Sequence, residues 1–298
     1  MARKDPRTPE TKIKQLEMEL ADRDRELLSF RKELAQINLQ LEKFINQIAG
    51  ELKLASVIQR SLVPTEIPNI PGFDFSTKFV ASPLTGGDYF DIFEMQDKMQ
   101  FGILMSNSSG HGMASLFMSV LLKLTTQIEA KKGLDPEEVL KHMSREIQNN
   151  IKGEDLARVF YGIVDRRRYQ LTYCRAGEVL SFLYKYAEDK LIKLDKGSEA
   201  IGKKTQPQYK AETIKLDPRD RLIVLSAGIV NAINAKREKY GEDRLHSVIL
   251  EKARSGCHDM RNEILFQISR FADGQDYPHD LSVVIMEVKD KVIQLRKG

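Results

Sequence analysis

An apolar seven-residue repeat from residue 13 to residue 62 constrains this chain more than any other feature. Its first seam consists of Ile13, Leu20, Leu27, Leu34, Leu41, Ile48, Ala55 and Leu62. The second seam consists of Leu16, Phe30, Ile37, Phe44 and Ile58, and it is interrupted by the polar residues Arg23 and Glu51. Such a repeat, flanked by many Glu, Lys and Arg residues, is typical of a coiled coil. A single helix cannot cover its own stripe, so we expect a homodimer through a coiled-coil helix over 13–62.

A long helix that packs back onto its own domain is the alternative interpretation of this repeat. Three prolines, Pro64, Pro68 and Pro71, end the helical pattern, because proline lacks a backbone N–H and clashes with the preceding turn. We therefore expect a disordered N-terminus at 1–12, a globular domain over 63–290 and a C-terminal tail at 291–298.

Composition excludes several other classes of protein. Apolar residues make up 41% of the 298 residues, which suffices for an ordinary core. No run of 18 apolar residues exists, and the charged start contains no apolar signal region, so we expect a cytoplasmic protein with no membrane span. Cys174 and Cys257 fit no metal-ligand spacing and are expected to be free thiols. The net charge of +4 is mild, and the basic run at 166–168 fits a hairpin turn better than a nucleic-acid site.

The apolar pattern within the globular domain indicates strands and helices in mixed order. Alternation at 73–79 predicts a half-buried strand. Further strands are expected at 99–105, 158–164, 169–174, 179–186, 211–216, 221–226 and 281–288. Helices are expected at 113–131, 136–151, 242–254 and 258–271, with Asp135 as the N-cap of the second and Pro136 at its first position. Short polar turns between strands favour antiparallel sheets, so the domain is expected to be α+β.

Three loops combine small residues with polar groups, and a ligand could bind there. Residues 106–112 end an apolar strand and open a helix, whose N-terminus favours anions. Gly86 and Gly87 form a turn that presents the carboxylate of Asp88, and 226–228 end another apolar strand. Each loop taken alone also fits a purely structural turn.

In their order and spacing, four segments together resemble bacterial PPM-type serine/threonine phosphatases of the RsbU/SpoIIE group. The segments read GGDYFD at 86–91, SNSSGHG at 106–112, SAG at 226–228 and HDLS at 279–282, where the family usually has GGDxxD, DxSGHG, TDG and DD(I/M)T. The resemblance covers about residues 51 to 288. It implies two packed antiparallel sheets with helices outside. It also implies two Mn²⁺ or Mg²⁺ ions, held by aspartates, that activate a water for attack on phosphoserine or phosphothreonine.

The same resemblance shows where this chain departs from the family. Of the four ligand positions, Asp88 keeps its aspartate, and the others carry Asn107, Ala227 and His279. Each lost charge about 4 Å from a divalent ion forfeits roughly 8 kcal/mol of attraction at an effective dielectric near 20. A single ion could still use the remaining acids Asp88, Asp91 and Asp280. The other site-loop positions that the resemblance assigns are Gly86, Gly87, Gly110, His111, Gly112 and Gly228, and the family's Ala-Gly-His is here Ala176, Gly177 and Glu178.

These departures predict a pseudophosphatase or regulatory binding protein of an RsbU-like partner-switching pathway, with no assigned catalytic residue or cofactor. Its expected partner is a STAS-type anti-sigma-factor antagonist or another signalling protein. The alternative is an active phosphatase that removes phosphate from such an antagonist through a rearranged Mn²⁺ or Mg²⁺ site. A third interpretation is a coiled-coil scaffold whose globular domain only caps the helix.

Overall fold

The long N-terminal helix is present. The computed structural model describes residues 9–83, 86–109, 113–151, 155–202 and 208–289, and it divides between Glu51 and Leu52 into two compact units. Helix α1 spans Pro9–Leu62. Residues 9–12 were expected to be disordered, but they are helical. Proline suits the first helical turn, and Glu10 complements the helix dipole there.

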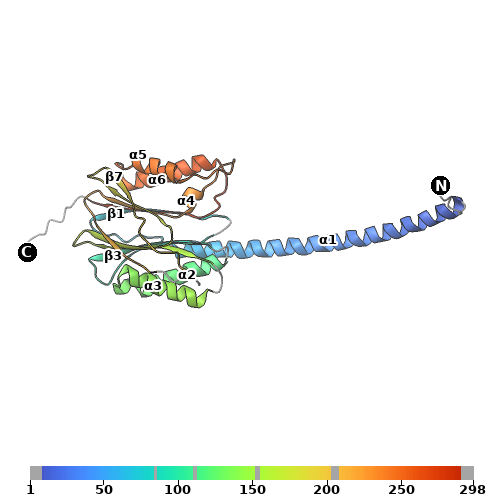
Figure 1. Ribbon diagram of the computed structural model, residues 1–298, viewed down its shortest axis with the longest axis horizontal. Helices are drawn as coiled ribbons and strands as arrows, with labels where there is room; N and C mark the ends of the chain where they lie inside the picture. Colours follow the sequence, from blue (N-terminus) through green and yellow to red (C-terminus); the bar gives the residue numbers. More distant parts are fainter. Residues whose placement is uncertain (1–8, 84–85, 110–112, 152–154, 203–207, 290–298) are drawn as a thin grey trace, which may run out of the picture. The chain divides into compact units, whose positions relative to one another are not determined.

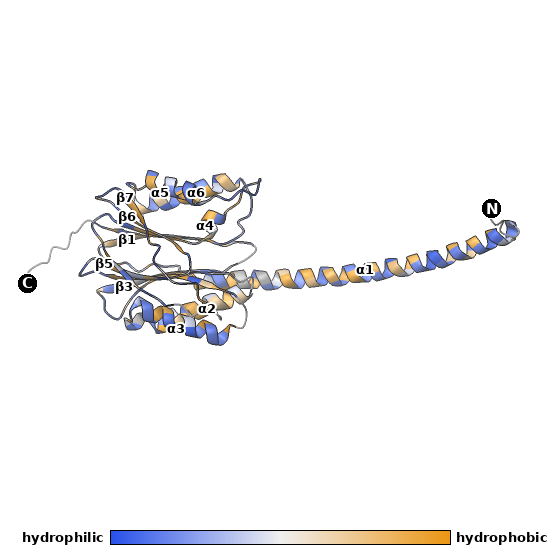
Figure 2. Cartoon of the chain, in the orientation of Figure 1, coloured by the Kyte–Doolittle hydropathy of each residue, from blue (hydrophilic) through white to orange (hydrophobic). Residues whose placement is uncertain are grey.

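The apolar seams of α1 are exposed from Ile13 to Ile48, whereas Ile58 and Leu62 near its end are half-buried. Leu20 is 65% exposed, Leu27 49% and Leu34 59%. Figure 2 shows apolar and polar residues following one another in bands along this helix. Leucines in such numbers are normally buried, so these seams are suited to contact with another apolar surface.

The second unit contains two five-stranded sheets in which all neighbouring strands are antiparallel. The first has the order β1 (Phe73–Val80), β10 (Leu281–Val288), β9 (Arg221–Leu225), β6 (Leu180–Lys185) and β7 (Lys190–Lys193). The second has the order β2 (Asp88–Glu94), β3 (Gln100–Ser108), β4 (Ala157–Asp165), β5 (Gln170–Ala176) and β8 (Glu212–Lys215). The expected sandwich of two antiparallel sheets is confirmed.

Helices cover the outer face of each sheet (Figure 1). One layer consists of α2 (Met113–Ile128), the 3₁₀ turn η1 (Ala130–Lys132) and α3 (Pro136–Asn150); the other consists of α4 (Gly228–Asn231), α5 (Glu242–Glu251) and α6 (Cys257–Ala272). The α+β class is confirmed, and Pro136 begins α3 as expected, although Asp135 makes no side-chain cap. None of the helices in the described ranges combines the length and apolar character needed to cross a bilayer. Cys174 and Cys257 are buried free thiols.

Sequence reasoning missed three elements: β2, β7 and α4. Strand β2 begins at Asp88, within a segment that its glycines marked as a turn, and its residues are mostly buried on both faces. Strand β7 shows no alternation of apolar and polar residues, since two half-buried residues lie between two exposed lysines. A strand buried on both faces shows no alternation of apolar and polar residues, so the period-two signal fails for β2.

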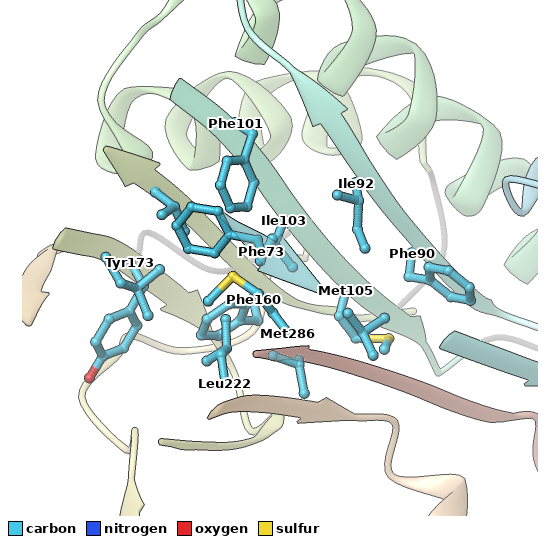
Figure 3. Packing of buried hydrophobic residues seen from close by; sticks show 14 of the residues in the cluster. Phe73, Phe90, Ile92, Phe101, Ile103, Met105, Phe160, Tyr173, Leu222 and Met286 are labelled. Atoms are coloured by element: carbon cyan, nitrogen blue, oxygen red, sulfur yellow. The ribbon is translucent and has the colours of Figure 1, made fainter. Parts of the chain in front are cut away.

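The main core lies between the two sheets, where the rings of Phe73 and Phe101 stand 4.9 Å apart at 70°. Figure 3 shows Phe73, Phe101, Phe160, Leu222 and Met286 filling this space. Successive strand residues face opposite sides of a sheet. The core residues that point into this space are Phe90 and Ile92 of β2, Ile103 and Met105 of β3, and Phe160 and Val164 of β4. By the same alternation, Asp88, Asn107 and Arg158 continue these rows beyond the apolar core, where the inter-sheet space becomes polar.

Candidate functional site

Strand pairing brings three polar residues into one row at the end of the inter-sheet space. Asp88 of β2 pairs with Asn107 of β3, and Asn107 pairs in turn with Arg158 of β4. Residues directly opposite one another on neighbouring strands have their Cβ atoms about 5 Å apart. The register therefore makes Asn107 the direct neighbour of both Asp88 and Arg158.

Both carboxylate oxygens of Asp88 accept hydrogen bonds from side chains. The Asn107 amide Nδ2 donates to Oδ1 at 2.5 Å, and the Ser282 hydroxyl from the other sheet donates to Oδ2 at 2.8 Å. Asp88 itself is only 1% exposed. A neutral amide and a hydroxyl thus occupy the oxygens through which the family's aspartate would bind a cation.

The carboxylate of Asp280 holds the glycine turn in place. Its Oδ2 accepts from the backbone N–H of Gly87 at 2.9 Å, from that of Asp88 at 3.2 Å and from the Gln59 amide at 2.6 Å. Its Oδ1 accepts from the backbone N–H of Ser82 at 2.8 Å. With four donors, this buried carboxylate is satisfied by the protein itself.

Gly228 is required where its segment meets the backbone of Asp280, and Gly86 leaves room for the Gln59 side chain. A Cβ on Gly86 would lie 1.5 Å from the Gln59 side-chain oxygen, and a Cβ on Gly228 would lie 1.9 Å from the Asp280 carbonyl oxygen. Both distances are far below van der Waals contact. The small residues that resemble the family's loops thus have a packing reason in this chain.

The environment of Asp88 disfavours its charged form. Burial, followed by the nearby charge of Asp280, raises the pKa of Asp88 to about 7, and hydrogen bonds from Asn107, Ser226 and Ser282 offset part of that rise. A divalent cation in contact with this carboxylate would instead lower the pKa of Asp88.

A cleft of about 450 Å³ opens beside this row. Its walls include Asn107, Arg158, Glu178, Ala227, Asn231 and His279. Ala227 directly precedes α4 and presents a methyl group where the family has an aspartate, and His279 is exposed. The cleft therefore brings together three of the four positions that the resemblance assigned as ligands or former ligands, together with Arg158 and Glu178. The fourth, Asp88, is buried next to Asn107 and does not line the cleft.

Asp91 does not join this group. Its carboxylate accepts from the Tyr89 hydroxyl at 2.8 Å, and Tyr89 belongs to the apolar cluster on the helix-covered face of the sheet. Asp88 lies on the opposite, inter-sheet face, as strand alternation requires. The single-ion set of Asp88, Asp91 and Asp280 is thus corrected, because one member is on the other side of the sheet. Gly110, His111 and Gly112 lie outside the described residues.

The donor set around the cleft does not fit the family's two hard divalent ions. Such ions take about six oxygen ligands, and the protein's share includes carboxylates that contact the ion directly. Here Asp88 accepts from an amide and a hydroxyl, Asp280 accepts from four N–H donors, and the side chain of Ala227 has no ligand atom. The carboxylates that remain are satisfied within the protein and are not directed at a shared ion.

A second group of ligand-type side chains lies between β1 and α6, where Asp74, Cys257 and His258 have ligand atoms within 4.8 Å of one another. Contacts among these side chains and with Ser76 explain why they lie close together without requiring an ion. The Cys257 thiol donates to Asp74 at 3.7 Å, and His258 Nδ1 is 2.9 Å from the Ser76 hydroxyl. Burial, followed by the charge of Asp74, raises the pKa of Cys257 to about 12 and keeps the thiol protonated. We assign this group a structural role.

Sequence reasoning identified Asp88, Asn107, Ala227 and His279 but missed Arg158 and Ser282. Their roles depend on pairing between strands that are distant in the sequence. The missed strand β2 supplies the first of those pairings. A correct register for β2, β3 and β4 would have placed Arg158 beside Asn107.

Comparisons with known proteins agree with this fold. Residues 97–289 match the family described as Stage II sporulation protein E (SpoIIE). The chain is 22% identical over 243 residues to the phosphoserine phosphatase RsbU of Bacillus subtilis, covering 82% of this chain and 71% of RsbU. The SiaA-PP2C domain of Pseudomonas aeruginosa has a similar fold, with a TM-score of 0.67, 19% identity, and coverage of 82% of this chain and 98% of that domain.

A second solved structure contains the RsbU and RsbW domains of Rv1364c from Mycobacterium tuberculosis. It has a TM-score of 0.63 at 20% identity and covers 75% of this chain and 62% of that protein. At these identities the solved structures establish the shared fold.

Proposed function

Because the chain belongs to the SpoIIE family and has its two-sheet fold, we propose that it is a pseudophosphatase: it binds a signalling partner and does not remove phosphate. The hydrogen bond from Asn107 to Asp88 carries this proposal. In a catalytic site of this family a carboxylate at position 107 would repel Asp88 unless a cation lay between them. Here a neutral amide donates directly, so the pair is stable without a cation.

The partner we propose is a STAS-type anti-sigma-factor antagonist of a partner-switching pathway. The similarity to RsbU, which is a phosphoserine phosphatase, supports this class of partner, as does the fold shared with a protein that joins RsbU and RsbW domains. A protein that occupies the antagonist would compete with the kinase or phosphatase that modifies it.

We also propose that two copies associate through residues 13–62 as a parallel coiled coil. The exposed seams of α1 support this, because apolar side chains at both seam positions between Ile13 and Ile48 are left uncovered in a single chain. Arg23 and Glu51, within one seam, would restrict the register and the number of partner helices.

The second candidate is an active phosphatase with a rearranged metal site. Its support is the family itself and the survival of Asp88 and Asp280 near the cleft. This candidate requires Asp280 to give up hydrogen bonds to Gly87, Asp88 and Gln59 before it can bind an ion.

The deciding experiment measures phosphate release by the full chain with millimolar Mn²⁺ or Mg²⁺. The substrates are p-nitrophenyl phosphate and a STAS-domain protein phosphorylated on serine. We expect no more release than from an Asp88→Ala variant. Metal-dependent release clearly above that control would establish the active phosphatase instead.

A further inference from the structure

Arg158, at the end of the polar row beside the cleft, also has a neighbour directly after the next strand, β5. Beyond Asp88, Asn107 and Arg158, the register of β4 and β5 brings Gly177 opposite Arg158, since Val159 pairs with Ala176. A Cβ on Gly177 would lie 2.9 Å from Cγ of Arg158, and Gly177 has a positive φ of 72°. Glycine at this position thus leaves room for the Arg158 side chain.

Arg158 is half-buried and lines the cleft. Within the described parts of the chain, no carboxylate forms an ion pair with its guanidinium. The two glutamates of the cleft differ from each other: Glu242 is paired with Lys193 at 2.7 Å, and Glu178 is exposed to solvent. Among the described lining residues, Arg158 is the permanently charged cation.

We propose that Arg158 anchors the phosphate of a phosphoserine or phosphothreonine on the partner protein. This inference rests on the proposed function, because it specifies the phosphorylated form as the one that the cleft binds. In the metal-dependent relatives divalent ions supply positive charge for the phosphate. Guanidinium is suited to replace that charge, because its planar fork of donors matches phosphate oxygens in a bidentate arrangement.

The size and chemistry of the cleft fit this ligand. A volume of about 450 Å³ is within the range of ordinary small-ligand sites and admits a phosphorylated side chain. Asp280 meets the cleft with a carboxylate already satisfied by N–H donors. Glu178, which stands where the family has histidine, opposes a bound phosphate, but its exposure keeps that repulsion screened.

The test measures peptide binding by the full chain with EDTA present, so that no metal contributes. The probes are a fluorescent peptide with one phosphoserine among neutral residues, and its unphosphorylated counterpart. We expect the phosphorylated peptide to bind at least about tenfold more tightly, as a charge-assisted bidentate contact predicts. Arg158→Gln should abolish that preference, and Arg158→Lys should keep only part of it.

A matched variant controls for the loss of charge. Arg168→Gln removes an exposed arginine from the turn after β4, at the far end of that strand from Arg158, and should leave the preference unchanged. Glu178→Gln should strengthen binding of the phosphorylated peptide. Circular dichroism and urea denaturation establish that each variant is folded.

Three results would overturn the role of Arg158 and leave the pseudophosphatase proposal intact: no preference in the wild type, a preference that survives Arg158→Gln, or equal loss in Arg168→Gln. Competition by inorganic phosphate at the peptide's own concentration would show a site for free phosphate and would overturn the phosphoprotein assignment. Metal-dependent release of phosphate from the peptide would instead overturn the proposed function.

Discussion

Replacing Asp88 by Asn tests whether this buried carboxylate is adapted to a metal-free site. The substitution keeps the size and shape of the side chain. Its oxygen can still accept from Asn107, and its amide can donate to the Ser282 hydroxyl. What disappears is the negative charge, which burial and Asp280 both disfavour.

The magnitude follows from the rise of the Asp88 pKa from 3.8 to about 7. Since one pKa unit corresponds to about 1.4 kcal/mol, ionised Asp88 costs the folded state about 4 kcal/mol relative to an unperturbed aspartate. Between these two pKa values the folded state binds the proton and the unfolded chain does not. Stability therefore falls as pH rises through this window and becomes constant above it. From pH 5.5 to pH 8 the expected loss is about 2 kcal/mol.

The assay is urea denaturation of the full-length wild type and the Asp88→Asn variant at pH 5.5 and pH 8, with EDTA. The wild type should lose about 2 kcal/mol relative to the variant over this range. Asp97→Asn is the control, because the hydrogen bond from Arg167 lowers the pKa of exposed Asp97. The difference in unfolding free energy between the wild type and this variant should therefore not change with pH above about pH 5. If the difference in unfolding free energy between the wild type and Asp88→Asn changes by less than about 0.5 kcal/mol between the two pH values, that result refutes the argument, since Asp88 would then be ionised across the range.

Three further predictions concern other parts of the chain. The first restores all three family aspartates, through Asn107→Asp, Ala227→Asp and His279→Asp. Calorimetry should detect Mn²⁺ binding by the triple variant but by none of the single variants, because each single change leaves the site short of negative charge. Leu27→Glu with Leu34→Glu should convert a dimer into a monomer in light scattering, and an unchanged mass would contradict the coiled-coil proposal. Gln59→Leu removes the 2.6 Å donor to Asp280 and should lower the free energy of unfolding by about 1–3 kcal/mol, whereas a neutral result would mean that water replaces the amide.

Local patterns in the sequence determined most of the elements and the family. The heptads of 13–62 predict a helix because an α-helix brings every third or fourth residue to one face, and Pro136 marks the start of α3 because it suits a first turn. The order of the four loop segments was sufficient to predict the two-sheet sandwich. It was also sufficient to show that three ligand positions had changed, since these are statements about residue identity alone.

The tertiary structure decided what the surviving acids do. Asp88 and Asp91 are three residues apart, yet strand alternation places them on opposite faces of a sheet, and β2 had not been recognised as a strand. The donors to Asp280 come from Gln59, Ser82 and the 87–88 turn, about two hundred residues earlier in the chain. Hydrogen bonding and desolvation depend on which groups meet in space. A local sequence pattern therefore does not reveal that Asn107 satisfies Asp88 or that Arg158 stands beside them.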